Sequence, residues 1–229
     1  MKYKRLFLIF VGLCIFQQAL FAQDSQNQSW LFWTHSQKVS EKINLLIDAQ
    51  TRANGDLSEL NTLLFRGAFA FKLSEKSSMA LGYAYKVDFE DKKRSSYENR
   101  IYQQYEYDFK INKTEIQLRG RFEQRFLSDS VTNFALRARG FVAVQIPIVA
   151  DEKFSSGLFA GFQNELFLNV LNKQNVNNHF FDQNRPYISL GYRFSKKMET
   201  SFDYGLMSDQ GKVQKSLISV FRLSLSTDF

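Results

Sequence analysis

Two histidines and a nearby aspartate come closest to an acid–base pair in this 229-residue chain. His179 stands three residues before Asp182, and imidazole is the side chain that most often transfers protons near neutral pH. A solvated loop histidine has the same appearance, and the chain contains no Gly-x-Ser-x-Gly, His-Glu-x-x-His or phosphate-binding glycine loop. His35 is distant in sequence and Cys14 is the single cysteine. We therefore expect no catalytic residue, no cofactor and no metal ligand set.

Arginines and carboxylates at alternate positions are the second set of residues that could do chemistry. Guanidinium groups bridge several carboxylates through their planar fork, so this set suits either a sealing ion-pair network or an anion site. In the second case an anionic or zwitterionic ligand would be lined by Arg119, Arg121, Arg137 and Arg139. We assign to the network or site the residues Glu98, Arg100, Glu106, Arg119, Arg121, Glu123, Arg125, Arg137, Arg139, Glu165, Arg185 and Arg193, with Arg66, Glu199 and Asp203 on the same face.

Alternation with period two predicts the strands that carry this charged face. Within 97–111 the even positions are charged or polar and the odd positions are mostly apolar, and 114–127 repeats the pattern. Asn112-Lys113 between them allows only a tight hairpin turn. In the register that this turn sets, oppositely charged residues face each other in the pairs Lys110 with Glu115 and Glu106 with Arg119.

The alternation continues along the chain and leaves no helix of useful length. The expected strands are 37–52, 60–73, 78–90, 97–111, 114–127, 133–148, 155–170, 181–195, 198–208 and 216–229. We therefore expect an all-β fold, a single antiparallel up-and-down transmembrane β-barrel of about ten strands. Strands of this length suit a tilted bilayer crossing, and most of the longer connections fall on one side.

The chain begins with the charged, apolar, small-residue order of a secretory signal peptide. Basic residues within the first five positions precede an apolar run over 6–16, which is too short to span a membrane. Cleavage after Ala22 would give a signal peptide over 1–22, a short periplasmic segment over 23–36 and a barrel over 37–229. Removing three basic residues leaves 27 against 23 acidic ones and lowers the net charge from +7 to +4. The basic residues do not cluster, so we expect no nucleic-acid partner.

A soluble lipocalin-like barrel would alternate in the same way, so the surroundings of the barrel need separate arguments. The 24 Phe, 10 Tyr and 2 Trp give the aromatic content expected of membrane girdles. The last residues resemble the C-terminal assembly signal of outer-membrane barrels, with Phe221, Leu223, Leu225 and Phe229 in the matching positions. These features favour the outer membrane of a Gram-negative bacterium, with lipid and the barrel assembly machinery as partners.

Five short segments carry a family resemblance: Trp33, 98–104, 119–126, Asn164-Glu165 and 181–185. With these segments the chain resembles the domain of unknown function 2490 family of outer-membrane β-barrel proteins across nearly its whole mature length. The resemblance implies an exported outer-membrane barrel. It implies no substrate, reaction or catalytic residue.

The function that we expect is a barrel with a charged, plugged lumen and a structural, adhesive or narrow-transport role. The alternative is a cell-surface hydrolase of the omptin type with its site at the extracellular rim. Geometry discriminates between them, since the hydrolase needs His179 beside a carboxylate and a nucleophile or water. A structural barrel needs no such arrangement and requires only that its strands pair into a closed ring.

Overall fold

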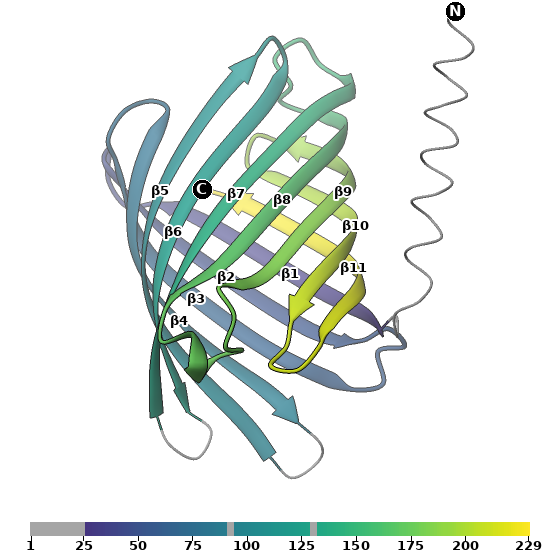
Figure 1. Cartoon of the computed structure of the whole chain (residues 1–229). Helices are drawn as coiled ribbons and strands as arrows, with labels where there is room; N and C mark the ends of the chain where they lie inside the picture. Colours follow the sequence, from purple (N-terminus) through teal and green to yellow (C-terminus); the bar gives the residue numbers. More distant parts are fainter. Residues whose placement is uncertain (1–25, 91–93, 129–131) are drawn as a thin grey trace, which may run out of the picture.

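The computed structural model describes residues 26–90, 94–128 and 132–229, which form a closed β-barrel (Figure 1). Its strands are β1 (Gln26–Lys38), β2 (Ile43–Asn54), β3 (Leu60–Lys72), β4 (Ser77–Glu90), β5 (Arg94–Ile111), β6 (Thr114–Ser128), β7 (Thr132–Ala150), β8 (Gly157–Leu171), β9 (Phe181–Ser195), β10 (Met198–Gln210) and β11 (Lys215–Asp228). A short 3-10 helix, η2 (Lys173–Asn175), lies between β8 and β9. The predicted signal peptide over 1–22 and its cleavage site lie outside the described residues.

The all-β closed barrel is confirmed, but the described residues form eleven strands rather than about ten. The additional strand is β1, which occupies most of the segment over 23–36 that we predicted to precede the barrel. The strand predicted over 37–52 is split by a turn and resumes as β2 at Ile43. Residues 30–33 of β1 are Trp-Leu-Phe-Trp, so both faces of the strand are apolar and the period-two pattern is hidden.

The additional strand changes how the barrel closes. β1 pairs with β11 in parallel, whereas every other neighbouring pair is antiparallel. Gln26 pairs with Ile218 and Ser36 with Asp228, so both strands run toward the end that holds Phe229. We call this end the C-terminal rim, with turns at 39–42, 73–76, 112–113, 151–156 and 196–197. The opposite, N-terminal rim carries the start of β1 and the connections 55–59, 172–180 and 211–214.

The hairpin of β5 and β6 has the predicted register. Ile111 pairs with Thr114, and the oppositely charged pairs Lys110 with Glu115 and Glu106 with Arg119 face each other as expected. Lys110 Nζ lies 2.6 Å from the Glu115 carboxylate. The sequence of a two-residue turn thus fixes which side chains point into the barrel on both strands.

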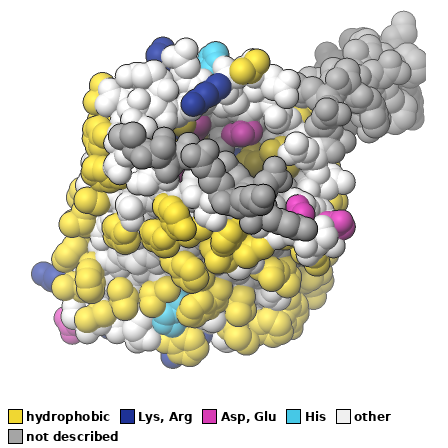
Figure 2. All heavy atoms as spheres, turned by 90° about the horizontal axis from the view of Figure 1, so that it is seen from below, with side chains coloured by type: hydrophobic (Ala, Val, Ile, Leu, Met, Phe, Trp, Pro, Cys, Tyr) yellow, Lys and Arg dark blue, Asp and Glu magenta, His cyan; other side chains and the backbone are white. Residues whose placement is uncertain are grey.

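The outer wall of the barrel is apolar and its interior is charged. Large apolar side chains are exposed on every strand except β2, for example Leu81 on β4, Phe162 on β8 and Leu223 on β11. Figure 2, a view from the N-terminal rim, shows such side chains along the perimeter of the molecule. Charged residues such as Glu123 and Arg137 are buried inside. A soluble barrel would place its apolar and charged side chains the other way round.

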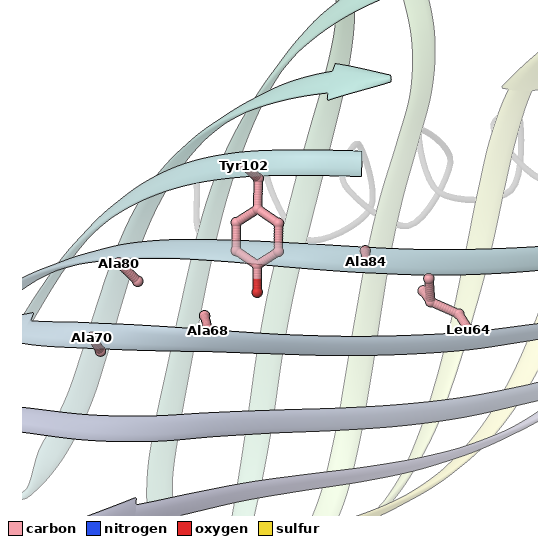
Figure 3. Packing of buried hydrophobic residues seen from close by; sticks show 6 residues of the cluster. All are labelled: Leu64, Ala68, Ala70, Ala80, Ala84 and Tyr102. Carbon is pink, nitrogen blue, oxygen red and sulfur yellow. The ribbon is translucent and has the colours of Figure 1, made fainter. Parts of the chain in front are cut away.

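Small side chains line one inner wall and make room for larger ones. Figure 3 shows a cluster from β3, β4 and β5 that comprises Leu64, Ala68, Ala70, Ala80, Ala84 and Tyr102. Tyr102 pairs across the strands with Gly82, where an added Cβ would lie 2.3 Å from the Tyr102 ring. The small residues thus leave room for the Tyr102 ring, and the Arg121 guanidinium lies 4.3 Å from the centre of this ring inside the lumen.

Glycine also pairs with an aromatic residue across the strands of the opposite wall. Phe159 on β8 pairs with Gly191 on β9, and Tyr187 on β9 pairs with Gly205 on β10. An added Cβ would lie 2.2 Å from the Phe159 ring at Gly191 and 2.3 Å from the Tyr187 ring at Gly205. In each pair the missing side chain lets an inward ring lie flat along the barrel wall.

Candidate functional site in the charged lumen

Buried ion pairs fill one side of the lumen, along β5 to β9. At its edge, Glu98 accepts hydrogen bonds from Arg100 Nε at 2.7 Å and Arg100 Nη2 at 2.8 Å, and from Arg125. Arg100 and Glu98 are neighbours on the inward face of β5, while Arg125 comes from β6. Both oxygens of this buried carboxylate therefore accept hydrogen bonds from the two arginines.

Glu123 is the centre of this network and is 1% exposed. Its Oε2 accepts from Arg137 Nε at 2.9 Å and Nη2 at 2.7 Å, and its Oε1 accepts from Arg139 Nη1 at 2.6 Å. Arg137 Nη1 continues to Asp182 at 2.8 Å, and Arg139 Nη2 to Glu165 at 2.7 Å. One carboxylate from β6 is thereby joined through two arginines of β7 to carboxylates of β8 and β9. We call the set Glu98, Arg100, Arg119, Arg121, Glu123, Arg125, Arg137, Arg139, Glu165 and Asp182 the paired network.

The four arginines that we considered as an anion site belong to the paired network. Arg137 and Arg139 each bind two carboxylates, and Arg119 Nη2 donates to Glu165 at 3.0 Å. Arg121 donates to Gln104 Oε1 from two nitrogens and lies 3.8 Å from Glu123. Because three of the four donate directly to carboxylates and Arg121 lies beside Glu123, the geometry favours the sealing role over a ligand site.

Glu106 and Arg119 face each other in the register but do not form an ion pair in the described residues. Arg119 reaches Glu165 on β8 instead, and Glu106 accepts from Gln104 Nε2 at 3.2 Å. A long arginine side chain can reach across the lumen, so it can bind a carboxylate on a strand that is not adjacent to its own. Glu106 and Arg119 therefore face each other as predicted without forming a direct ion pair.

Arg193 covers part of the lumen at the C-terminal rim. Its guanidinium donates to Glu199 at 2.9 Å, to Glu115 at 2.8 Å and to the carbonyl oxygen of Phe154 at 2.9 Å. Its Cζ also lies 3.9 Å from the centre of the Phe154 ring. Phe154 belongs to the turn at 151–156, yet only 2% of it is exposed. This turn therefore folds inward and its ring covers part of the rim.

Hydrogen bonds to Asp151 hold the turn that carries Phe154. The Asp151 carboxylate accepts from the backbone N–H of Ser155 at 2.7 Å and from its hydroxyl group. These hydrogen bonds lower the pKa of Asp151 below its ordinary value. Phe154 has φ +49, a left-handed conformation that a bulky residue adopts only when its surroundings repay the strain. Burial of the ring beneath Arg193 supplies that compensation.

The connection 172–180 folds inward at the N-terminal rim. Asn177 is buried, and its Nδ2 donates to the carbonyl oxygen of Gln210 at 2.8 Å and to Asp182 Oδ1 at 3.2 Å. Asn169 on β8 donates to Asn177 Oδ1 at 3.0 Å. The contacts anchor this connection to three strands, so part of the N-terminal rim is also covered.

His179 and Asp182, the pair considered for hydrolysis, point to different environments. Asp182 is buried and its carboxylate accepts from Arg137 and Asn177. His179 is exposed, and its backbone rather than its ring contacts Asn177. His35, the second histidine, lies in β1 with its Nδ1 2.9 Å from Thr227 Oγ1 and its ring against Trp33 and Phe229. The carboxylate is thus engaged by the paired network rather than by a histidine.

Empty space remains in the lumen beside the paired network. A cavity of about 810 Å³ is lined by Trp30, Arg52, Arg185, Tyr187 and Arg222, and also by paired-network residues such as Arg119, Arg137 and Arg139. A second cavity of about 600 Å³ lies at the C-terminal rim. The two share lining residues that include Asp48 and Arg66, which are bound to each other at 2.7 Å. We call the wall of the larger cavity around Trp30, Arg52, Arg185, Tyr187 and Arg222 the hollow side.

Several residues of the hollow side were not among those expected from the sequence. Arg52 and Asp48 lie on β2 at the inward positions of an alternating strand, a signal that the displaced strand boundary obscured. Arg222 pairs with Asp203 at 2.8 Å and was hidden in the apolar C-terminal row. Arg185 was included, and the structure places it on this side.

The predicted assembly row lies on the outer face of the last strand. Phe221, Leu223, Leu225 and Phe229 are all exposed. Lys38 N donates to the carbonyl oxygen of Phe229 at 2.6 Å, and Phe229 N donates to Ser36 at 2.9 Å, so the last residue is tied to β1. The chain end thus completes the seam between the first and last strands.

Other kinds of site are lacking in the part of the chain that the structure describes. It contains no group of three or more His, Cys, Asp or Glu residues arranged to hold a metal ion. Over the same residues, no helix has the length and apolar character needed to cross a membrane.

The comparison with protein families matches residues 27–214 to the family described as protein of unknown function, DUF2490. The chain belongs to this family. The match begins in β1 and ends just before β11, so the family region includes the strand that alternation failed to reveal. A search of curated proteins found no match. The family resemblance given by the sequence segments is therefore confirmed.

Proposed function

We propose that this DUF2490 protein is an outer-membrane β-barrel whose paired network closes most of the lumen, which limits it to a structural or narrow-transport role. The observation that carries the proposal is the exposure of large apolar side chains on ten of the eleven described strands, around a buried, charged interior. In hydrocarbon such a surface is favourable, and a closed barrel satisfies every backbone N–H and C=O group within its ladders. In water the same surface would promote association.

The proposed orientation places the C-terminal rim in the periplasm. This rim has the two-residue turns 112–113 and 196–197, and bacterial barrels have short periplasmic turns. Trp33, His35 and Phe229 stack on one another at this rim, with Lys197 Nζ 5.2 Å from the centre of the Phe229 ring. Aromatic and basic side chains of this kind are favoured at a membrane interface. The start of β1 would then lie on the cell exterior.

Closure follows from the charges that fill the lumen. The paired network occupies one side, and Phe154 with Arg193 covers part of the periplasmic rim. The two cavities share lining residues that include Arg119, Glu199 and the ion pair of Asp48 with Arg66, so a solute passing between them would move beside these charged side chains. We therefore expect passage of small solutes only.

The test combines gel mobility with conductance. The mature protein, refolded in detergent, should migrate faster unheated than boiled, because a closed barrel resists detergent. In planar bilayers it should show no large open conductance, and the double substitution D48A/R66A should raise the conductance. Solubility without detergent together with unchanged mobility would leave only a soluble barrel, and a large conductance of the unaltered protein would refute the closed lumen.

Assembly gives an independent test of the membrane assignment. Removing Phe229 should reduce the amount of barrel in the outer-membrane fraction, because this residue ties the last strand to β1 and would carry the signal for the assembly machinery. Lys113→Ala in a turn of the same rim is the control and should insert normally. Normal insertion of the chain without Phe229, at native expression, would contradict the role of the C-terminal row.

A further inference from the structure

Two arginines on the hollow side have no carboxylate partner. Arg52 donates from Nη2 to Gln50 Oε1 at 2.9 Å, and Arg185 donates from Nη2 to Gln183 Oε1. Among the described residues these are the only contacts in which either guanidinium donates a hydrogen bond, and Nε of each is buried without a partner. Five of the six arginines of the paired network, in contrast, donate directly to carboxylates, and the sixth, Arg121, donates to Gln104 and lies 3.8 Å from Glu123. The hollow side thus holds two cations whose charge is not matched by contact.

Glutamine side chains link these two arginines to carboxylates. Gln50 Nε2 donates to Asp48 at 3.0 Å, and Asp48 is itself bound to Arg66. In the same way, Gln183 Nε2 donates to Asp209 at 2.5 Å. A glutamine relay of this kind orients a guanidinium group and leaves its positive charge available, because an amide oxygen carries no net charge. The same arrangement on two different strands indicates a built feature.

One aromatic ring brings the two free guanidinium groups together. Arg52 Cζ lies 4.1 Å and Arg185 Cζ 5.3 Å from the centre of the Trp30 ring, which is 2% exposed. Tyr187 packs 6.4 Å from Trp30, is 3% exposed, and has a buried hydroxyl group without a hydrogen-bond partner among the described residues. Two cations and an unused hydroxyl group therefore line one cavity wall.

We propose that Arg52, Arg185 and Tyr187 form a binding site for the oxyanion group of a water-soluble ligand, a phosphate or carboxylate, on the Trp30 wall of the larger cavity. Two guanidinium groups with unused donors match the several acceptor oxygens of such a group. The cavity of about 810 Å³ exceeds the size of the oxyanion itself, and Phe32 and Trp30 line it, so an apolar portion of the ligand fits beside the charge. Lys212 in the connection 211–214 lines the same cavity toward the N-terminal rim and gives the ligand a basic entrance.

The two tryptophans of the chain provide a direct probe, because Trp30 lines the site and Trp33 faces outward. In the W33F protein, Trp30 is the only indole. Iodide is an anionic quencher and caesium a cationic one, so the ratio of their quenching constants reports the charge at Trp30. We expect iodide to quench Trp30 on the order of tenfold more strongly than caesium, since a charged cleft concentrates counter-ions. Inorganic phosphate should compete and restore the fluorescence.

Variants of W33F then assign the effect to the two arginines. R52Q and R185Q should each lower the iodide-to-caesium ratio, R52K should retain most of it, and the double variant R52Q/R185Q should bring it close to one. R193Q is the matched control, because it removes a lumen arginine at the other rim and should leave the ratio unchanged. The heat-dependent gel shift checks folding of each variant, and the comparison of quenchers in W33F itself requires no lumen substitution.

Three results of the quenching experiments would each overturn the proposed anion site. Equal quenching by iodide and caesium in W33F, a ratio that R193Q lowers as much as R52Q, or phosphate without effect would each refute it. These results do not depend on the membrane proposal, since a soluble barrel with the same lumen would give the same quenching. Loss of the gel shift with an intact iodide preference would refute the membrane barrel and leave the anion site in place.

Discussion

The two sides of the lumen accommodate a buried arginine in different ways. On the paired side Glu123 binds Arg137 and Arg139 directly. On the hollow side Arg52 rests on Trp30 and reaches a carboxylate only through Gln50. Direct pairing matches the charge, whereas an aromatic ring and a glutamine relay support a guanidinium group and keep its charge available. Counting interior arginines therefore does not reveal which of them could bind a ligand.

Glu123→Ala should have the largest effect, because it leaves Arg137 and Arg139 buried with reduced compensation. Breaking a buried pair by removing one partner costs about 3–5 kcal/mol. The free energy of unfolding, from urea titration of the barrel in detergent, measures the loss. Glu59→Ala in the exposed connection 55–59 is the control and should change stability little. A loss no larger than that of the control would mean that water fills the paired side.

Gly205→Leu should disturb the hollow side next most strongly, since an added Cβ would lie 2.3 Å from the Tyr187 ring. Overpacking of this kind costs about 1–3 kcal/mol. Gly140→Leu is the matched control, because no atom lies within 4 Å of its added Cβ. Urea unfolding compares the two variants. Equal stability of both would show that Tyr187 moves freely, and the wall that it forms would then be too soft to position a ligand.

Arg119→Ala should cost about 1.5 kcal/mol, the value of one hydrogen bond to a charged group. The loss is smaller than for Glu123→Ala because Arg139 still binds Glu165 at 2.7 Å. The same unfolding measurement applies. A double-mutant cycle with Glu165→Gln should show coupling, and one with Glu106→Gln should show little. The reverse order of coupling would mean that the strand register, rather than the contact across the lumen, determines the partner.

Arg52→Ala should have the smallest effect on unfolding, within about 1 kcal/mol of the unaltered barrel, because the loss of its contact with Trp30 is offset by relief of an unmatched charge. Arg137→Ala provides the contrast and should be far more destabilising. Urea unfolding of both variants decides the point. An equally large loss at Arg52 would identify it as a structural residue and weaken the distinction between the two sides.

Local pattern was sufficient for much of the fold. Alternation gave ten of the eleven strands of the described chain, with some boundaries displaced, and the two-residue turn gave the register of β5 and β6. The strand β1 was missed because the aromatic residues Trp30 and Phe32 face inward where a polar residue would mark the inner face. The same residues build the wall of the proposed site, so the exception to the pattern and the candidate function coincide.

The sequence by itself determined which residues point into the barrel, because side-chain direction in a strand has a period of two and is a local property. It did not determine the partners of those residues. Arg137 meets Asp182 and Arg193 meets Glu115 across strands that are far apart in the sequence, and Arg119 passes over its strand neighbour to reach Glu165. Only closure through β1 fixes the diameter of the lumen and therefore which guanidinium groups reach a carboxylate and which are left beside empty space.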